Sequence, residues 1–268
     1  SRVVTSTSTS VANVLRSSSA EVFMRSRNIN VNATNLKPRT RYYQFLDNTS
    51  GVDFMPKMLE ISRDSNLQNS GASAAFNIGE TVVGTIDDRE VTRFRLAHPR
   101  HKSGSFNAPD SFYNTNPYQS GEFTDTFYSS TSKVLNVDTF SMAQQAQGDY
   151  YGYAIAGMKL KGQTSGAEAY VKNVRLVSDN YGDLIGSFFL RDPNTTPSPS
   201  VRIRTGNKTY RLTSSKSNAE VLPGSTAISF GETSYNSTGT LEVWQRVVTV
   251  TTVRRTITTI TRTTTNTR

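Results

Sequence analysis

The segment Leu36-Lys37-Pro38-Arg39-Thr40-Arg41-Tyr42, with the run Tyr42-Tyr43-Gln44-Phe45-Leu46 behind it, indicates how this chain of 268 residues folds. Pro38 holds its own φ at about −65°, so the backbone bends at that point. The aromatic and aliphatic residues that follow have high β propensity and place an apolar face on an extended segment. The two segments together predict a turn that leads into a buried strand.

The spacing Leu-x-Pro-x-Thr-x-Tyr, at Leu36, Pro38, Thr40 and Tyr42, resembles the tyrosine corner of fibronectin type III and related immunoglobulin-like sandwiches. In that motif the tyrosine hydroxyl bonds to backbone a few residues upstream and holds a loop between the sheets. The resemblance implies an immunoglobulin-like β segment over residues 21–70. It implies no function, because such sandwiches host many functions.

Outward from this segment, short apolar stretches alternate with turns rich in Gly, Asn and Asp, and long stretches at helical spacing are nearly absent. The chain is therefore expected to be all-β, with two to three small β-sandwich or barrel-like domains and extended terminal arms. The expected parts are an N-terminal arm or linker (1–20), the immunoglobulin-like segment (21–70), a small β domain with an aromatic loop region (71–150), a further β domain (151–245) and a Thr-rich C-terminal arm (246–268).

Two stretches inside these domains share a pattern. Residues 79–96 and 157–176 each have Gly, four residues, Gly, and then a strand that ends in Arg-Leu, and the second stretch is two residues longer. Internal duplication explains the pattern, and so does coincidence among short strands punctuated by glycine.

The two ends of the chain have a distinct composition. The first twenty residues are rich in Ser and Thr, which is typical of a linker or of an arm that orders on a partner. Eleven of the last twenty residues are Thr, interleaved with Val250, Val253, Ile257 and Ile260. Because a lone strand of this kind is unstable unless it pairs, we expect it to pair with another chain; the alternative is a disordered tail.

An aromatic, turn-rich stretch covers residues 98–139. Such loops often pack against another chain, which makes Tyr113, Tyr118, Phe127 and Tyr128 candidate partner contacts. The alternative is an irregular loop that covers its own sheet.

Composition excludes several classes. The absence of cysteine excludes disulfides and thiolate metal sites, and is in keeping with folding in a reducing cytoplasm. No apolar run is long enough to span a bilayer and no signal peptide is present, so no membrane partner is expected. The chain starts without Met and is expected to be processed or a fragment. The net charge of +9 lies mostly in residues 201–268, spread along expected strands and not gathered into a patch, so nucleic-acid binding is not expected.

Catalytic chemistry has few candidates. His98 and His101, with Asp110, Asp87 and Asp88, are the only grouping with metal-ligand character, and a His-x-x-His in a Pro-containing loop is more often solvated. A glycosidase pair would be drawn from Asp87, Asp88, Glu90, Asp125 and Asp179. Asp179, Asn180 and Asp183 have Ca²⁺-binding oxygens, but making a turn accounts for them. We expect no catalytic residue, no metal and no cofactor.

Three motifs resemble recurrent segments in large virion proteins of T-even-like tailed phages, especially those of cyanobacteria. They are residues 23–28 with 36–40, residues 179–190, and residues 204–215. The resemblance implies a structural tail, baseplate or fibre-attachment protein of the virion, made in the host bacterial cytoplasm, which binds other virion proteins and copies of itself. The alternatives are a fibre domain that binds a receptor or glycan and, third, a tailspike glycosidase.

Overall fold

The computed structural model describes residues 2–20, 23–63, 73–144, 149–195, 201–225, 227–237 and 240–257. Within these residues the chain forms eighteen β-strands and one helix of four residues, which confirms the all-β class. Contacts divide the chain into two units: Phe23–Ser237 form one, and Ser1–Val22 with Thr238–Arg268 form the other.

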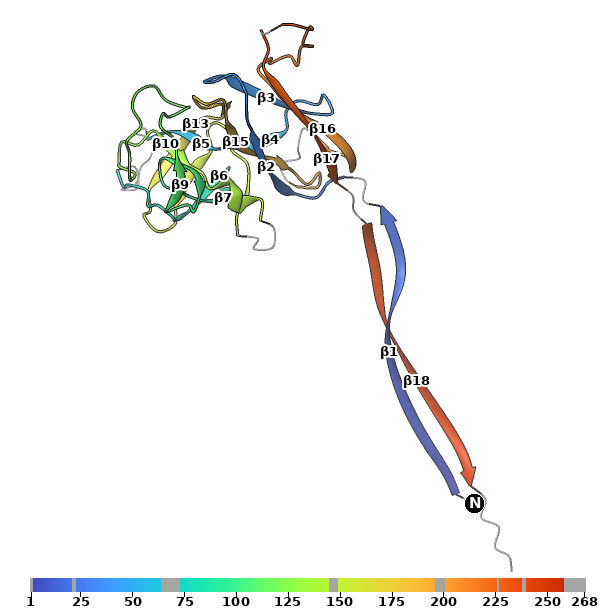
Figure 1. The fold of residues 1–268 in the computed structure, drawn as a ribbon. Helices are drawn as coiled ribbons and strands as arrows, with labels where there is room; N and C mark the ends of the chain where they lie inside the picture. Colours follow the sequence, from blue (N-terminus) through green and yellow to red (C-terminus); the bar gives the residue numbers. More distant parts are fainter. Residues whose placement is uncertain are drawn as a thin grey trace, which may run out of the picture. The chain divides into compact units, whose positions relative to one another are not determined.

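The largest sheet of the unit Phe23–Ser237 closes on itself. Strand β7 (Arg89–Arg95) and the residues that follow it meet the end of β10 (Val134–Asn136), which is the first strand of the sheet. Ala97 N–H donates to Asn136 O (2.9 Å), and Asp138 N–H donates to Arg95 O (3.0 Å), so the sheet closes between β7 and β10. The sheet is therefore barrel-like (Figure 1). Its seven strands, in spatial order, are β10 (Val134–Asn136), β5 (Met58–Ser62), β13 (Glu168–Asn173), β12 (Lys159–Gly162), β6 (Thr81–Ile86), β7 (Arg89–Arg95) and β11 (Tyr151–Gly152).

Side chains from every second position of these strands fill the inside of the barrel. They form one cluster that includes Leu59, Val82, Phe94, Leu135 and Leu160, each with no exposed surface. This alternation of buried and exposed positions is what the period of a β-strand requires.

Two smaller sheets face each other across a second core and make a sandwich. The shared core contains residues from both sheets: Val31, Tyr42, Leu46, Leu184, Phe188, Tyr210 and Leu212. The four-stranded sheet has the order β14 (Leu176–Val177), β3 (Arg41–Leu46), β16 (Gly206–Thr213) and β17 (Phe230–Ser237). The three-stranded sheet has the order β2 (Arg27–Ala33), β15 (Leu184–Leu190) and β4 (Asp53–Pro56).

The predicted division into 21–70, 71–150 and 151–245 is wrong, because strands from separate ranges pair with each other. β2 pairs with β15, and β5 pairs with β13, so the first and third ranges share both the sandwich and the barrel. Only Lys57 separates β4 from β5, so the chain passes directly from one sheet system to the other. Pairing between distant strands leaves no local composition shift that marks it.

The two stretches with a shared pattern become two hairpins that lie side by side in the barrel. β6 and β7 form one, β12 and β13 form the other, and β12 pairs antiparallel with β6. Gly84 faces the crossing, where a Cβ would come within 2.5 Å of Thr92 Cγ2 and 2.6 Å of Met158 Sδ. The glycine of the first hairpin thus allows the two hairpins to approach closely.

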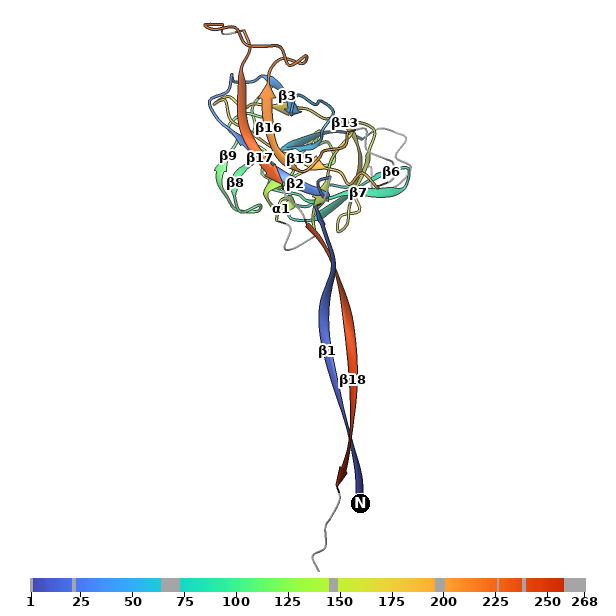
Figure 2. The same ribbon diagram turned by 90° about the vertical axis from the view of Figure 1, so that its right-hand side faces the viewer.

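The remaining elements of this unit are small. A hairpin is formed by β8 (His101–Gly104) and β9 (Pro109–Phe112), and α1 covers Thr139–Met142 (Figure 2). Over the described ranges, no helix has the length and apolar character to cross a membrane.

The second unit is a two-stranded antiparallel ribbon, here called the terminal ribbon. β1 (Arg2–Ala20) pairs with β18 (Thr240–Ile257), in a register that runs from Arg2 opposite Ile257 to Ala20 opposite Thr240 (Figures 1 and 2). Over the described residues, each end of the chain therefore has a strand partner in the other end, which the prediction of a linker or of an arm that orders on a partner over 1–20 did not include. Pairing of the C-terminal strand with another chain remains a prediction. The two ends of one chain pair because each offers the backbone donors and acceptors that the other lacks.

Candidate functional site

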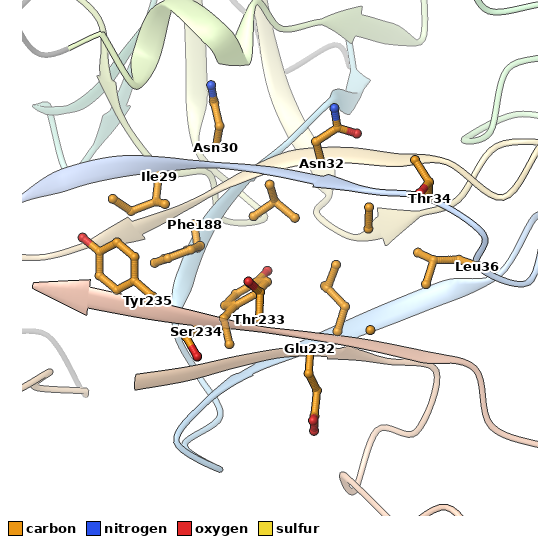
Figure 3. A pocket seen from close by; sticks show the side chains of 15 residues that line it. Ile29, Asn30, Asn32, Thr34, Leu36, Phe188, Glu232, Thr233, Ser234 and Tyr235 are labelled. Carbon is orange, nitrogen blue, oxygen red and sulfur yellow. The ribbon is translucent and has the colours of Figure 1, made fainter. Parts of the chain in front are cut away.

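An open groove lies between the edge strands β2 and β17 of the sandwich (Figure 3). β2 ends the three-stranded sheet and β17 ends the four-stranded sheet, so among the described residues neither strand has a neighbour on its outer side. The cavity between them has a volume of about 420 Å³, and the core residues Phe188, Tyr210 and Leu212 line it. The groove, called here the β2–β17 groove, therefore leads from the surface to the sandwich core.

Aromatic rings hold the wall of the groove. The Phe188 ring stacks on Tyr210 at a centroid distance of 4.7 Å and meets Tyr235 edge-on at 5.6 Å. Burial raises the pKa of Tyr210, whose hydroxyl donates to Gln44 Oε1 at 2.9 Å. The Tyr235 hydroxyl is buried and finds no partner in the described part of the chain. The groove thus combines an apolar wall with one unsatisfied polar group.

The arrangement suits an extended peptide segment. An edge strand presents a row of unpaired N–H and C=O groups, which another strand can use, while an apolar pocket takes alternate side chains. The polar side chains of Asn30 and Asn32 in β2, and of Ser234 in β17, point away from the groove (Figure 3). Hydrogen bonds to a bound segment would therefore come mainly from the backbone of the two edge strands.

The terminal ribbon offers a second surface of the same kind. It has two strands only, so the outer edge of each is unpaired by the described residues. Val250, Val253 and Ile257 lie in β18, opposite Thr9, Ser6 and Arg2 respectively. Ile260 lies outside the described residues. Contact of these four residues with a partner remains a prediction.

The tyrosine corner has the geometry that the sequence predicts. The Tyr42 hydroxyl accepts a hydrogen bond from Lys37 N–H (3.0 Å), five residues upstream, and donates to Ser229 Oγ (2.7 Å). Leu36 is buried in the same core as Tyr42, and Thr40 Oγ1 donates to Pro38 O (2.9 Å). The corner also binds the segment just ahead of β17, because Ser229 precedes that strand, which lies in the same four-stranded sheet as Tyr42.

We expect Tyr42→Phe to lower the free energy of unfolding by about 1–2 kcal/mol, since Lys37 N–H and Ser229 Oγ each lose a hydrogen bond to the Tyr42 hydroxyl. Tyr43→Phe is the matched control, because Tyr43 lies partly exposed with the Arg41 guanidinium 5.1 Å above its ring. Urea denaturation measures both variants. Equal stability of the two would contradict a structural role for the corner.

The carboxylate oxygens of Asp179 and Asp183, which are candidates for Ca²⁺ binding, already have partners within the chain. Lys102 Nζ lies 2.7 Å from Asp179 Oδ2 and 2.8 Å from Asp183 Oδ2, so an ammonium occupies the place between the two carboxylates. Asp179 Oδ1 accepts the N–H of Tyr181 and of Asp183, both at 2.9 Å. Turn formation, the alternative explanation of these residues, agrees with this geometry.

The two histidines do not gather ligands. His101 is buried, with Nδ1 2.8 Å from Lys57 Nζ and Nε2 3.1 Å from Gly104 O, and His98 Nδ1 accepts Arg100 N–H (3.1 Å). Both ring nitrogens of His101 are therefore engaged within the chain. Across the described ranges, no three His, Cys, Asp or Glu side chains are grouped so that they could hold a metal ion.

The acids singled out for a glycosidase have local explanations. Asp87 and Asp88, with φ of 49° and 61°, form the two-residue turn between β6 and β7. Positive φ at two successive residues is the requirement of a type I′ turn, and Asp tolerates it. Glu90 accepts from Arg93 and from the Tyr151 hydroxyl, which lowers the pKa of the Glu90 carboxyl; the hydrogen bond with Arg93 is the largest cause. Asp125 lies in an exposed loop.

Three of the four aromatic partner candidates are buried in their own chain, so that prediction is wrong for Tyr113, Tyr118 and Tyr128. Tyr113 and Tyr118 share a small core with Met58 and Val177, and the Tyr128 hydroxyl donates to Ala97 O at 2.6 Å. The loop therefore covers its own sheet, which was the alternative. Phe127 alone of the four is exposed, at 72%.

Lys57 is a residue that the sequence reasoning missed. It is 2% exposed, and it interrupts the apolar run Phe54-Met55-Pro56-Lys57-Met58-Leu59. That position was the available signal, since a lysine inside an apolar segment is rarely fully buried without a partner.

The fold and these surfaces define an all-β protein with paired terminal strands. A scan against protein-family models found no match, and neither did the searches of curated proteins and of solved structures.

Proposed function

We propose that this chain is a non-enzymatic structural component of a tailed-phage virion, an adaptor of the tail, baseplate or fibre attachment. The observation that carries the proposal is the terminal ribbon, in which the two ends of the chain pair over strands of 19 and 18 residues. The expected partners are other virion proteins and further copies of this chain.

The physical reason lies in the stability of the ribbon. A two-stranded ribbon is marginally stable in water, and three or more strands or a packed face are needed for independent stability. The terminal ribbon is a unit of its own and has two free edges among the described residues. A neighbouring subunit that adds a strand would satisfy the backbone groups of these edges and stabilise the ribbon.

The unit Phe23–Ser237 supports the same proposal. Several of its charged groups form internal pairs, including Lys102 with Asp179 and Arg175 with Glu60 at 2.9 Å. Such pairs fix loops onto the sheets, which suits a rigid body in an assembly. The three motifs that resemble segments of phage virion proteins support the proposal that this assembly is a phage virion.

The second candidate function is a fibre domain that binds a receptor or glycan. One observation favours it: Tyr181 is 63% exposed, and the side chains of Asn114 and Lys102 hold it in place. A fixed, exposed aromatic ring is a surface on which a sugar ring can stack. Trp244 would be a second aromatic group on which a sugar could stack; it lies in β18, and its side chain is outside the described side chains.

Gold-labelled antibody against residues 23–237, imaged on virions of a phage that encodes the chain, tests the proposal. Label at the tail tip or baseplate supports the adaptor, and label along distal fibres supports the receptor-binding alternative. Label that appears only after tail disruption also supports the adaptor. If the label binds neither intact nor disrupted particles, the proposal that the chain is a virion protein is contradicted.

A variant of the terminal ribbon tests the observation that carries the proposal. Thr251→Pro with Thr252→Pro removes two successive backbone N–H groups of β18, so at least one ribbon hydrogen bond is lost whichever edge each N–H faces. We expect incorporation into virions to fall at least about tenfold, while the melting temperature of the unit Phe23–Ser237 is unchanged. Thr251→Ser with Thr252→Ser is the control. Undiminished incorporation of the proline variant would contradict the role of the ribbon.

A further inference from the structure

The proposed structural function does not account for the environment of Lys57, a buried lysine. Its Nζ lies 2.8 Å from His101 Nδ1 and donates to Val137 O at 2.9 Å. Both of these partners are neutral acceptors. Lys102 has a contrasting environment, because two carboxylates contact its Nζ.

The hydrogen bonds of His101 define its tautomer. Nε2 faces the carbonyl oxygen of Gly104, which only accepts, so Nε2 carries the proton and Nδ1 is left with a lone pair toward Lys57. Asn136 Nδ2 donates to Pro99 O and to His101 O, both at 2.9 Å, and so holds the backbone around the ring. His101 is therefore a positioned, neutral base beside the amine.

The environment favours an uncharged amine. Burial lowers the pKa of Lys57 to about 7, against a smaller raising effect of Asp138, which is itself paired with Arg95 at 2.6 Å. Burial, followed by the charge of Lys57, lowers the pKa of His101 to about 4. At neutral pH a large share of Lys57 thus has a free lone pair, which is the nucleophilic form.

A cavity of about 440 Å³ adjoins the amine, between the three-stranded sheet and the segments that carry His101 and α1. Lys57 and His101 line it, together with neutral polar side chains of Asn32, Ser103 and Thr139 and the apolar side chain of Ile185. Among the described residues, Lys102 is the only other cation of the lining, and it is bound to Asp179 and Asp183. The lining therefore suits a small, polar, uncharged molecule.

We propose that this cavity binds a small aldehyde or ketone, which Lys57 holds as an imine. The nitrogen lone pair attacks the carbonyl carbon, and the electrons of the C=O π bond move to oxygen. His101 Nδ1 accepts one proton from nitrogen and passes it to the oxygen, which gives a neutral carbinolamine. His101 then takes the second N–H proton and gives it to the hydroxyl, which leaves as water while the C=N bond forms. Amine and carbonyl thus yield imine and water with no redox partner. This site is separate from the proposed assembly function.

Reductive trapping on the full folded chain tests the site. The protein is treated with propanal and sodium cyanoborohydride at pH 7.5, and peptide mass mapping then compares its nine lysines. We expect Lys57 to be alkylated at least about tenfold faster than Lys161, whose side chain is 58% exposed, because burial favours the uncharged, nucleophilic form of the Lys57 amine. The advantage is expected to shrink as the pH falls to 6 and to vanish in urea. Slower alkylation of Lys57 than of Lys161 would overturn the proposal.

Two further measurements separate the carbonyl site from its rivals. Ile185→Trp fills the cavity, and should lower the labelling of Lys57 at least about tenfold while Lys161 is unaffected; Lys161→Arg should leave Lys57 labelling unchanged. Unchanged labelling of Lys57 in the tryptophan variant would overturn the assignment to this cavity.

Acetone is expected to compete with propanal. Competition by acetate or phosphate but not by acetone would overturn the carbonyl assignment and indicate an anion site.

Discussion

Phe188→Ala is expected to lower the free energy of unfolding of the unit Phe23–Ser237 by about 3–5 kcal/mol, the range for removal of a buried aromatic side chain. Phe188 is 2% exposed and lies in the middle of β15, opposite Ile29 on one side and Phe54 on the other. Its removal would leave a cavity next to the β2–β17 groove, where the edge strands give little support for collapse. The loss should therefore lie at the upper end of the range.

The aromatic contacts of Phe188 add to the burial. The Phe188 ring stacks on Tyr210 and meets Tyr235 edge-on. Each such aromatic pair contributes about 0.5–1.5 kcal/mol beyond the burial of area. Urea denaturation followed by circular dichroism measures the change. Phe127→Ala is the control, since an exposed side chain away from special features changes stability by about 0.5 kcal/mol at most. A loss below about 1 kcal/mol for Phe188→Ala would show that the sandwich core does not close around this ring.

Asp179→Ala is expected to cost about 3–5 kcal/mol, the range for breaking a buried ion pair by removing one partner. Asp179 is 1% exposed, and its two oxygens accept from Lys102, from the backbone of Tyr181 and from the backbone of Asp183. Its carbonyl accepts Arg39 N–H at 3.1 Å. The substitution thus loosens both the 179–183 turn and its attachment to the tyrosine corner.

Two comparisons make the Asp179 result specific. Asp125→Ala, at an exposed loop position, should leave the free energy of unfolding within about 0.5 kcal/mol of the native chain. Addition of Ca²⁺ should leave the melting temperature unchanged, because the ammonium of Lys102 already lies between the two carboxylates. Stabilisation by Ca²⁺ together with tolerance of Asp179→Ala would contradict the ion-pair assignment.

Local features of the chain were predictable from sequence. The turn at Pro38, the hydroxyl bond of Tyr42 and the two-residue turn at Asp87 and Asp88 depend on φ preferences and on neighbours a few residues away. The alternation of apolar and polar residues likewise predicts strands and their buried faces, since it depends only on the period of two. The all-β class follows from these local signals taken together.

The candidate surfaces depended on distant parts of the chain. Nothing in the Thr-rich tail indicates that its partner is β1, because many extended segments can satisfy the same backbone groups. The burial of Tyr113 and Tyr118 likewise depends on Met58 and Val177, which other segments supply. An aromatic loop that covers its own sheet and one that meets a partner have the same composition.

From the amino-acid sequence alone, therefore, came the strand character of the chain, its turns and the tyrosine corner. The closure of the barrel, the pairing of the terminal ribbon and the environment of Lys57 required the three-dimensional structure. The reason is that φ preferences and side-chain period act within a few residues, whereas strand pairing and desolvation are sums over neighbours that lie far apart in the chain.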